Sequence, residues 1–285
     1  MLQAAVAGWI SGGAYALLGV CVVLLYRMVG VLNLAQAAVG VFGTYVMLVV
    51  YGLGWGVWTG VLLGLIAGAL IGALLGSIMS KWFSEAPLQT RSSVTIAMLI
   101  ALLTIGLRVF GSDPRPAPDL FGNSSLEAFG VVIPTEAIVV IALAALLAFG
   151  IGRFLQRTKV GTWLRALSER PTAAELLGIP AQALTVGVWA VAGAISSLAV
   201  MLILPTRTPD FTVLTLLILP AMAAALVGVF KSFGITIVGG LSIGLIEGLT
   251  SSIGSIAPFR QVIWFAVMLL ALLYAQRKEV WDAAR

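Results

Sequence analysis

Residues 153–180 read RFLQRTKVGTWLRALSERPTAAELLGIP and interrupt a chain that is otherwise almost continuously apolar. Five of the sixteen Lys and Arg residues of the chain fall here, before Pro171. The segment still keeps an i, i+3, i+4, i+7 apolar spacing, which places one apolar face on a short helix: Val160, Trp163, Leu164 and Leu167. A charged segment with such a face needs something to dock against. The stretch therefore predicts a docking partner at this point of the chain.

The composition of the whole chain excludes a soluble globular domain. Of 285 residues, 61% are hydrophobic and only 9% are charged, and the mean hydropathy is +1.12. Several uncharged runs approach the roughly 20 residues that a helix needs to cross a hydrocarbon core. We predict an all-α, polytopic transmembrane bundle of about eight or nine membrane segments, forming one domain over residues 1–285. The expected segments are 3–26, 31–50, 57–80, 93–111, 134–155, 182–204, 211–230, 234–250 and 259–276.

The distribution of cations predicts which side of the membrane each loop occupies. With residues 153–180 in the cytoplasm, twelve cations fall inside: Arg27, Lys81, Arg91, Arg153, Arg157, Lys159, Arg165, Arg170, Lys231, Arg277, Lys278 and Arg285. Three fall outside, Arg115, Arg207 and Arg260, and this excess matches the positive-inside bias. The N-terminus is then external and the C-terminus cytoplasmic. A broken or re-entrant segment at 31–50 would change the sidedness of the N-terminus. The longest external loop, 112–133, is expected to form a surface cap.

Small residues predict where helices pack closely. Gly60, Gly64, Gly68, Gly72 and Gly76 recur every four residues in one segment, and Gly240, Gly244 and Gly248 repeat the pattern in another. Such spacing lets two backbones approach each other within lipid. Pro220 is expected to kink or break the 211–230 segment, and interrupted helices often flank transport pathways.

Few polar groups lie within the expected spans. Glu247 shares a face with the second glycine series, and a carboxylate within a span is a functional candidate by default. Asn33 and Gln36 share a helix face, near Tyr15 if the first two segments pack together. These amides either bind a zwitterionic solute or hold helices together, and the sequence leaves both open. Ser196, with its neighbour Ser197, is a candidate for the pathway or a small packing residue.

Several kinds of chemistry are absent from the sequence. The chain has no histidine and one cysteine, Cys21, so histidine-based catalysis, metal sites built on these ligands and an intrachain disulfide are excluded. No GxxxxGK[ST] stretch is available to hold nucleotide phosphates. We expect no catalytic site, no metal and no cofactor bound by this chain, and the basic balance serves membrane anchoring and not nucleic-acid binding. Energy for any transport must come from elsewhere.

The segment RTKVGTWLRALSERPTAAELLGIP resembles the cytoplasmic coupling segment of ABC importer permeases of the branched-chain amino acid (leucine/isoleucine/valine) type. The positions that carry the resemblance are Thr158, Gly161, Arg165, Ala166, Ala173, Ala174, Leu177, Gly178 and Ile179. GWISGGAYALLGVCVVLLYRMVGVLNLAQAAVGVFGTY is similar to the first-span signature of the family, and LPAMAAALVGVFKSFGITIVGGLSIGLIEG to its other hallmark. One departure is Gln36, Ala37 and Ala38, where the family often has His-Gly-Glu, which puts the amino-acid substrate in question.

The resemblance implies a multi-pass permease in the cell membrane of a prokaryote. Its implied partners are a second permease chain, identical or related, two ATP-binding subunits that hold ATP and magnesium, and an extracytoplasmic solute-binding protein. The segment 157–180 becomes the coupling loop, and Asn33, Gln36, Tyr15, Ser196 and Glu247 become candidates for the translocation pathway. The coupling residues are then Gly161, Trp163, Leu164, Arg165, Ala166, Leu167, Arg170, Ala173, Ala174, Leu177 and Gly178, with the face of Trp163, Leu164 and Leu167 seated in an ATPase groove.

Three alternatives remain open from the residues alone. An ion-coupled secondary transporter would move solute by itself under an ion gradient. A membrane scaffold would use its loop only to bind a partner. In the third alternative, the amphipathic helix lies on anionic lipid headgroups.

Overall fold

The computed structural model describes residues 2–113, 115–122, 125–128, 131–206, 210–253, 259 and 262–283. The cations Arg207, Arg260 and Arg285, used above to assign sidedness, lie outside this set. The helices are α1 (Leu2–Val29), α2 (Gln36–Gly52), α3 (Val57–Trp82), α4 (Leu88–Phe110), α5 (Thr135–Arg157), α6 (Lys159–Glu169), α7 (Pro171–Leu176), α8 (Ala181–Ile203), α9 (Phe211–Thr215), α10 (Ile218–Val227), α11 (Phe233–Ser251) and α12 (Val262–Ala283), with a 3₁₀ turn η1 at Leu204–Thr206. Two short strands, β1 (Ser125–Ala128) and β2 (Val131–Pro134), pair antiparallel.

The predicted all-α membrane bundle is confirmed. Among the described residues, six helices are long and apolar enough to cross a membrane, namely α1, α3, α4, α5, α8 and α11. Shorter apolar helices at Gln36–Gly52, Phe211–Val227 and Val262–Tyr274 occupy the three remaining predicted segments. The sequence did not predict the β1–β2 hairpin, which lies within the expected surface cap at 112–133.

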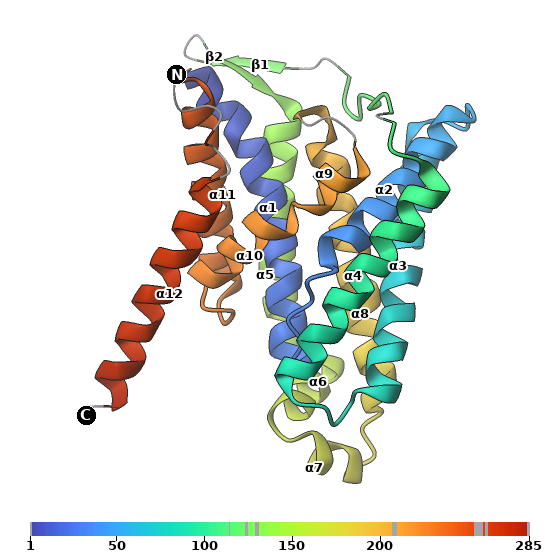
Figure 1. Cartoon of the computed structure of the whole chain (residues 1–285), viewed down its shortest axis with the longest axis vertical. Coiled ribbons are helices and arrows are strands. Elements are labelled where there is room, and N and C mark those ends of the chain that lie inside the picture. The colour runs from blue at the N-terminus through green and yellow to red at the C-terminus, as the bar shows by residue number, and fades with distance from the viewer. Residues whose placement is uncertain are drawn as a thin grey trace.

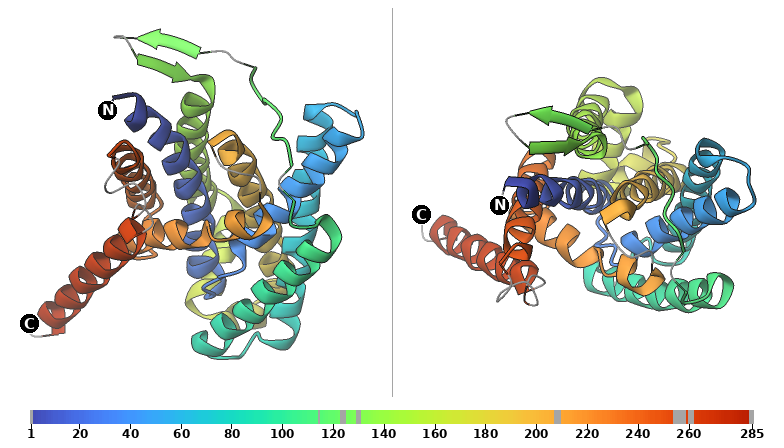
Figure 2. Two further views of the ribbon diagram at one scale, coloured as in Figure 1. Left: turned by 45° about the horizontal axis from the view of Figure 1, so that its top comes forward. Right: turned by 90° about the horizontal axis from the view of Figure 1, so that it is seen from above.

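Helix α1 forms the centre of the bundle. It packs against α5, α8, α10 and α11, and Figure 2 shows it enclosed by them when the molecule is seen from above. In the most apolar 18-residue stretch of α1, 94% of the residues are buried. A helix without a polar face must be buried in protein or lipid, and here the neighbouring helices provide that burial.

The remaining helices lie on either side of α1. Helices α2, α3 and α4 gather on one side and α11 and α12 on the other, with α12 angled away from the body (Figure 1). The N-terminus and the hairpin lie at one end of the long axis, and α6 and α7 lie at the opposite end. Helix α12 runs from the hairpin end toward the α6–α7 end. This arrangement agrees with N-terminus and C-terminus on opposite sides.

Two predicted segments are broken. Residues 30–35 are not helical, so the segment predicted at 31–50 begins as irregular chain with a turn at residues 34–35 and becomes α2 only at Gln36. The segment predicted at 211–230 is interrupted between Thr215 and Ile218, ahead of the proline. Pro220 itself lies in the first turn of α10, where the missing N–H has no intrahelical acceptor in any case. The predicted break is present, and the proline starts the second helix instead of bending a continuous one.

Candidate functional site

The break between α1 and α2 is held together by the first two turns of α4. Gly30 takes a positive φ of 66° and ends α1. The backbone N–H of Leu34 donates to Oγ1 of Thr95 at 3.1 Å, and that hydroxyl lies 3.0 Å from the carbonyl oxygen of Leu32. One turn earlier, Arg91 donates from Nη1 to the carbonyl oxygen of Val29 at 3.1 Å. Backbone groups freed at membrane depth need partners within the protein, and α4 supplies them.

A buried polar cluster joins the unwound segment to two helices. It consists of Asn33 in the unwound segment, Gln36 at the start of α2 and Ser196 on α8. Asn33 donates from Nδ2 to Oε1 of Gln36 at 2.7 Å, and Gln36 donates from Nε2 to Oγ of Ser196 at 2.6 Å and to the carbonyl oxygen of Ala192 at 3.0 Å. All three side chains of the cluster are at most 1% exposed. In this conformation their polar groups connect the start of α2 to the middle of α8. A solute would have to replace these partners to bind here.

Tyr15 lies in a second cluster, not with the amides. Its hydroxyl donates to Oε2 of Glu247 at 2.7 Å, and Nε1 of Trp264 donates to the same oxygen at 3.1 Å. The residue of α1 that meets Ser196 is Cys21, through a side-chain hydrogen bond. Glu247 is 5% exposed and borders a cavity of about 120 Å³ that Ser11 and Ser251 also line. The five pathway candidates thus form two separate groups.

The two glycine series lie at close helix contacts. On α3, Gly60 and Gly64 face Met47 and Gly43 of α2, and Gly68, Gly72 and Gly76 face α8. On α11, Gly240 and Gly244 face Ala16 and Gly12 of α1. A Cβ at Gly244 would meet the backbone of Gly12 and Gly8. At Gly72, Gly240 and Gly244 the nearest atoms belong to the backbone of the facing helix, so a side chain there would force the helices apart.

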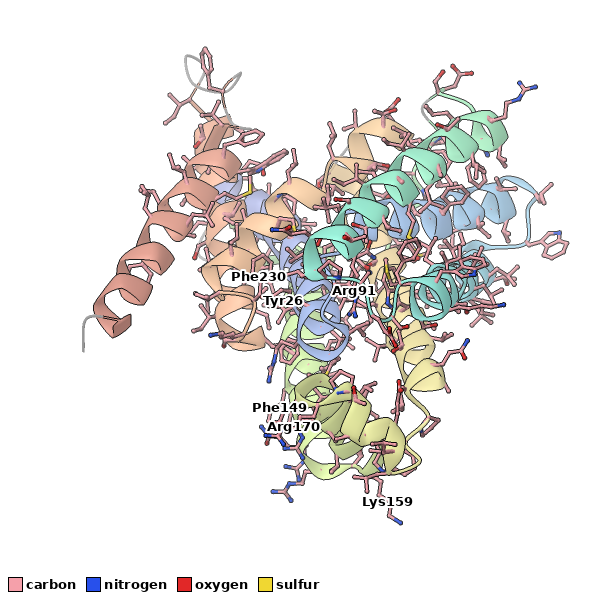
Figure 3. The ribbon with its side chains drawn as sticks, turned by 60° about the horizontal axis from the view of Figure 1, so that its bottom comes forward. Tyr26, Arg91, Phe149, Lys159, Arg170 and Phe230 are labelled. Carbon is pink, nitrogen blue, oxygen red and sulfur yellow. The ribbon has the colours of Figure 1, made fainter. Side chains whose placement is uncertain are left out.

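Helices α6 and α7 form an elbow at the end of the bundle opposite the N-terminus, and we refer to residues 158–178 as the elbow. The hydroxyl of Thr158 accepts a hydrogen bond from the backbone N–H of Gly161 at 2.9 Å and caps α6. Pro171 begins α7 and Gly178, with φ of 79°, follows its end. Figure 3 shows Lys159 and Arg170 at this end of the molecule.

The elbow buries part of the apolar face that the sequence assigned to a partner. Leu164 and Leu167 are 4% and 7% exposed, Ala174 is buried, and Gly161 packs on the backbone of Phe154 and Leu155. The expectation that Leu164 and Leu167 present a docking face is therefore wrong, since an amphipathic helix can bury its stripe against its own bundle. The predicted residues that remain exposed are Trp163, Arg165, Arg170, Ala173, Leu177 and Gly178, with Ala166 half-buried.

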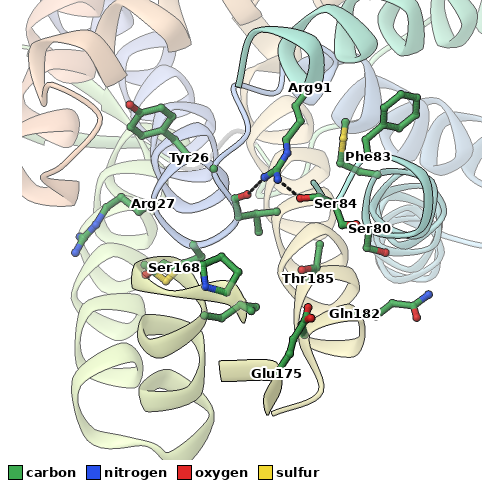
Figure 4. Close-up of a pocket in the computed structure, with 17 residues that line it drawn as sticks. Tyr26, Arg27, Ser80, Phe83, Ser84, Arg91, Ser168, Glu175, Gln182 and Thr185 are labelled. Carbon is green, nitrogen blue, oxygen red and sulfur yellow. Dashed lines mark hydrogen bonds between the residues drawn. The ribbon is translucent and has the colours of Figure 1, made fainter. Parts of the chain in front are cut away.

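A cavity of about 400 Å³ separates the elbow from the body of the bundle. Figure 4 shows Arg91 above it, donating to the carbonyl oxygens of Val29 and Ser84. Ser168 and Glu175 of the elbow and Gln182 and Thr185 of α8 line the same space. Arg91 thereby joins the end of α1 to the turn between α3 and α4, next to the elbow.

Sequence reasoning missed three residues of these sites. Arg91 was counted only as a cytoplasmic cation, and Thr95 and Trp264 were not singled out. The spacing of Arg91 and Thr95, four residues apart at the start of one helix, indicates a shared face. Nothing in the sequence shows that this face meets residues 29–34. Trp264 is separated from Glu247 by 17 residues, part of which lie outside the described residues.

Comparison with known proteins places the chain in a family. Its relatives include the permease protein BraD of a high-affinity branched-chain amino acid transport system from Pseudomonas aeruginosa, 25% identical over 96% of this chain and 93% of the relative. The corresponding protein LivH of Escherichia coli is 27% identical over 95% of this chain and 92% of the relative. The solved structure of PsaBC from Streptococcus pneumoniae in complex with Fab shares the fold, with a TM-score of 0.50 and 16% identity over 95% of this chain and 90% of that one. The family model described as branched-chain amino acid transport system / permease component matches residues 4–272. The chain, a multi-pass membrane protein, belongs to this permease family.

Proposed function

We propose that the chain is the membrane-spanning permease subunit of an ATP-driven importer, and that its solute is a branched-chain amino acid or a related small polar solute. The single observation that carries this proposal is the family match across residues 4–272, which includes the elbow and every pathway candidate. The chain forms the translocation pathway. ATP and magnesium are bound by partner subunits.

The exposed surface of the elbow is where an ATP-binding subunit docks. Leu176 and Leu177 at the end of α7 are 85% and 81% exposed, and leucines this exposed are expected at a binding surface when polar residues surround them. Trp163 is 41% exposed on α6, and Arg165 and Arg170 add positive charge that suits an acidic groove. The buried Leu164 and Leu167 have a different role, since they fix the elbow to the bundle and transmit its movement.

The mechanism follows from what the elbow contacts. Helix α6 packs on α5, α1 and α8. Movement of the elbow therefore acts on the central helix α1 and on α8, which accepts hydrogen bonds from Gln36. The break at residues 30–35 lies between α1 and α2 and is held by hydrogen bonds to side chains of α4. Closure of the ATPases on ATP would move the elbow and switch the bundle between outward-open and inward-open states.

The complete transporter would contain two permease chains, identical or related, two ATP-binding subunits and an external solute-binding protein. The bound solute-binding protein would deliver the amino acid at the hairpin end, which the sidedness assigns to the outside. This composition rests on the family, and the single chain provides one half of the membrane part.

Reconstitution tests the proposal. We expect uptake of radiolabelled leucine, isoleucine or valine into proteoliposomes only when the ATP-binding subunits, internal ATP and the solute-binding protein are present. Leu177→Asp should abolish both co-purification of the ATP-binding subunits and uptake, whereas Leu177→Met should preserve both. Leu164→Ala should leave the docking surface intact and lower thermal stability, because that side chain is buried.

The main rival is an ion-coupled carrier, and Glu247 is the buried titratable group that such a carrier would need. Uptake by the purified chain alone under a proton or sodium gradient would overturn the proposal. Stoichiometric ATPase binding without any ATP-dependent uptake would instead favour a scaffold.

A further inference from the structure

An apolar groove of about 240 Å³ opens on the side of the bundle between α5, α6 and α8. Its walls include Phe154 and Leu155 of α5, Val160 and Leu164 of α6, and Gly187 and Val191 of α8. Phe154 and Val191 are 45% and 51% exposed, so the groove is open to the surroundings of the protein and not sealed inside it. A Cβ added at Gly187 would meet no atom within 4 Å.

The depth of the groove identifies what surrounds it. Its residues on α5 fall within the last turns before Arg157, and its residues on α8 fall within the first turns after Ala181. Both helices are long and apolar enough to span the membrane. The groove therefore lies beside the acyl chains, just beneath the headgroups on the elbow side, where an open apolar surface is covered by hydrocarbon.

Positive charge lies at the headgroup side of the groove. Arg153 and Arg157 are one turn apart at the end of α5, and Lys159 begins α6, so that these cations flank Phe154 and Val160 in the sequence. All three are exposed, and residues 150–168 contain no Asp or Glu. Long basic side chains at the end of a span extend toward lipid phosphates while their stems follow the apolar surface.

We propose that this groove binds one anionic phospholipid of the elbow-side leaflet, with an acyl chain between α5, α6 and α8 and the phosphate at Arg153, Arg157 and Lys159. The roof of the groove is α6, through Val160 and Leu164. A bound chain therefore supports the elbow from beneath and fixes its spacing from α8. The binding site follows from the structure alone, and only its effect on transport rests on the proposed function.

The first test measures lipid retention. The purified full chain is exchanged into nanodiscs containing phosphatidylcholine and phosphatidylglycerol, and the lipids that stay bound are counted by native mass spectrometry. We expect retention of phosphatidylglycerol on the order of a hundredfold above phosphatidylcholine, because each of three basic residues near the surface favours anionic lipid. Equal retention of the two lipids by the wild-type chain would overturn the proposal.

Two sets of variants separate the acyl chain from the headgroup. Gly187→Leu fills the groove and should abolish retention, whereas Gly150→Leu is its control, because Gly150 lies on α5 in open space and does not line the groove. The triple exchange Arg153→Gln, Arg157→Gln and Lys159→Gln should leave a bound lipid but remove the preference for phosphatidylglycerol. Retention by Gly187→Leu at the level of Gly150→Leu would place the lipid elsewhere and refute the site.

Cross-linking decides between a lipid and a protein occupant. Phosphatidylglycerol with a photoreactive group in its acyl chain should label peptides that contain Phe154 or Val191. A photoreactive amino acid at Val191 that captures a protein in native membranes, and no lipid, would contradict the proposal. In the reconstituted transporter, we expect phosphatidylglycerol to raise uptake by the wild type and not by Gly187→Leu. Absence of uptake in every vesicle would refute the proposed function, and the retention result would be unaffected.

Discussion

The phenolic oxygen of Tyr15 lies 2.7 Å from Oε2 of Glu247, although 232 residues separate them in the chain. The bond crosses from the central helix α1 to α11, beside the contact of Gly12 with Gly244. It gives a buried carboxylate a strong hydrogen-bond donor, and Trp264 adds a second donor from α12. One side chain thereby joins the first helix of the chain to the last two.

Tyr15→Phe removes this donor while keeping the ring. We expect the free energy of unfolding in detergent to fall by about 0.6–2 kcal/mol, the range of interhelical hydrogen bonds in membranes. Tyr51→Phe is the control, since Tyr51 lies on α2 and is 39% exposed. Equal stability of the two variants would mean that the hydroxyl of Tyr15 contributes nothing to the packing of α11.

Gly244→Ala tests the seam between α1 and α11. The added methyl group would meet the backbone of Gly12 and Gly8, so the helices must separate. We expect loss of the monodisperse peak in size-exclusion chromatography and a clearly lower melting temperature. Gly234→Ala on the same helix meets nothing within 4 Å and should be neutral or slightly stabilising, because alanine favours the helix. A wild-type melting temperature for Gly244→Ala would rule out close packing here.

Thr95→Val tests whether α4 holds the break between α1 and α2. Valine has the shape of threonine but leaves the N–H of Leu34 without its acceptor. We expect a loss of about 1–3 kcal/mol in the free energy of unfolding, the cost of an orphaned buried polar group. Thr104→Val is the matched control, because Thr104 is exposed and its hydroxyl bonds only the carbonyl oxygen of Ile100 in the same helix. Similar losses for both variants would contradict this role.

Val229→Gly should stabilise the protein. Val229 and Phe230 take φ angles of 50° and 53° in the turn between α10 and α11, a region that costs a residue with a side chain roughly 1–2 kcal/mol. Glycine removes that cost, so we expect a higher melting temperature. Val238→Gly, in the interior of α11, should lower the melting temperature, because glycine has a lower helix propensity than valine. A decrease for both exchanges would show that the turn is not strained.

The sequence predicted the positions of the apolar segments well, because hydrophobic length and glycine spacing are local properties. It also located the two broken segments, through the polar start of 31–50 and through Pro220. The short amphipathic helix predicted in the elbow from the spacing of Val160, Trp163, Leu164 and Leu167 is present as α6.

What the sequence could not predict is which faces meet. Leu164 and Leu167 form an apolar stripe that suits a partner as well as the home bundle, and only the fold shows that they are buried. Tyr15 was expected beside Asn33 because the first two segments are consecutive. The chain instead leaves α1 as a non-helical segment. Gln36 then meets Ser196 of α8, a contact across 160 positions of sequence that no local pattern encodes.

The enclosure of α1 has a consequence for biosynthesis. Helix α1, the most fully surrounded of the long apolar helices described, is synthesised before the neighbours that cover it, α5, α8, α10 and α11. Until α11 has been inserted and completes the packing around it, α1 must therefore remain in the lipid bilayer or beside an insertion factor. The high apolar content of α1 makes it stable in lipid during this time. Chains truncated before α11 should remain inserted in the membrane but be degraded because they are incompletely packed.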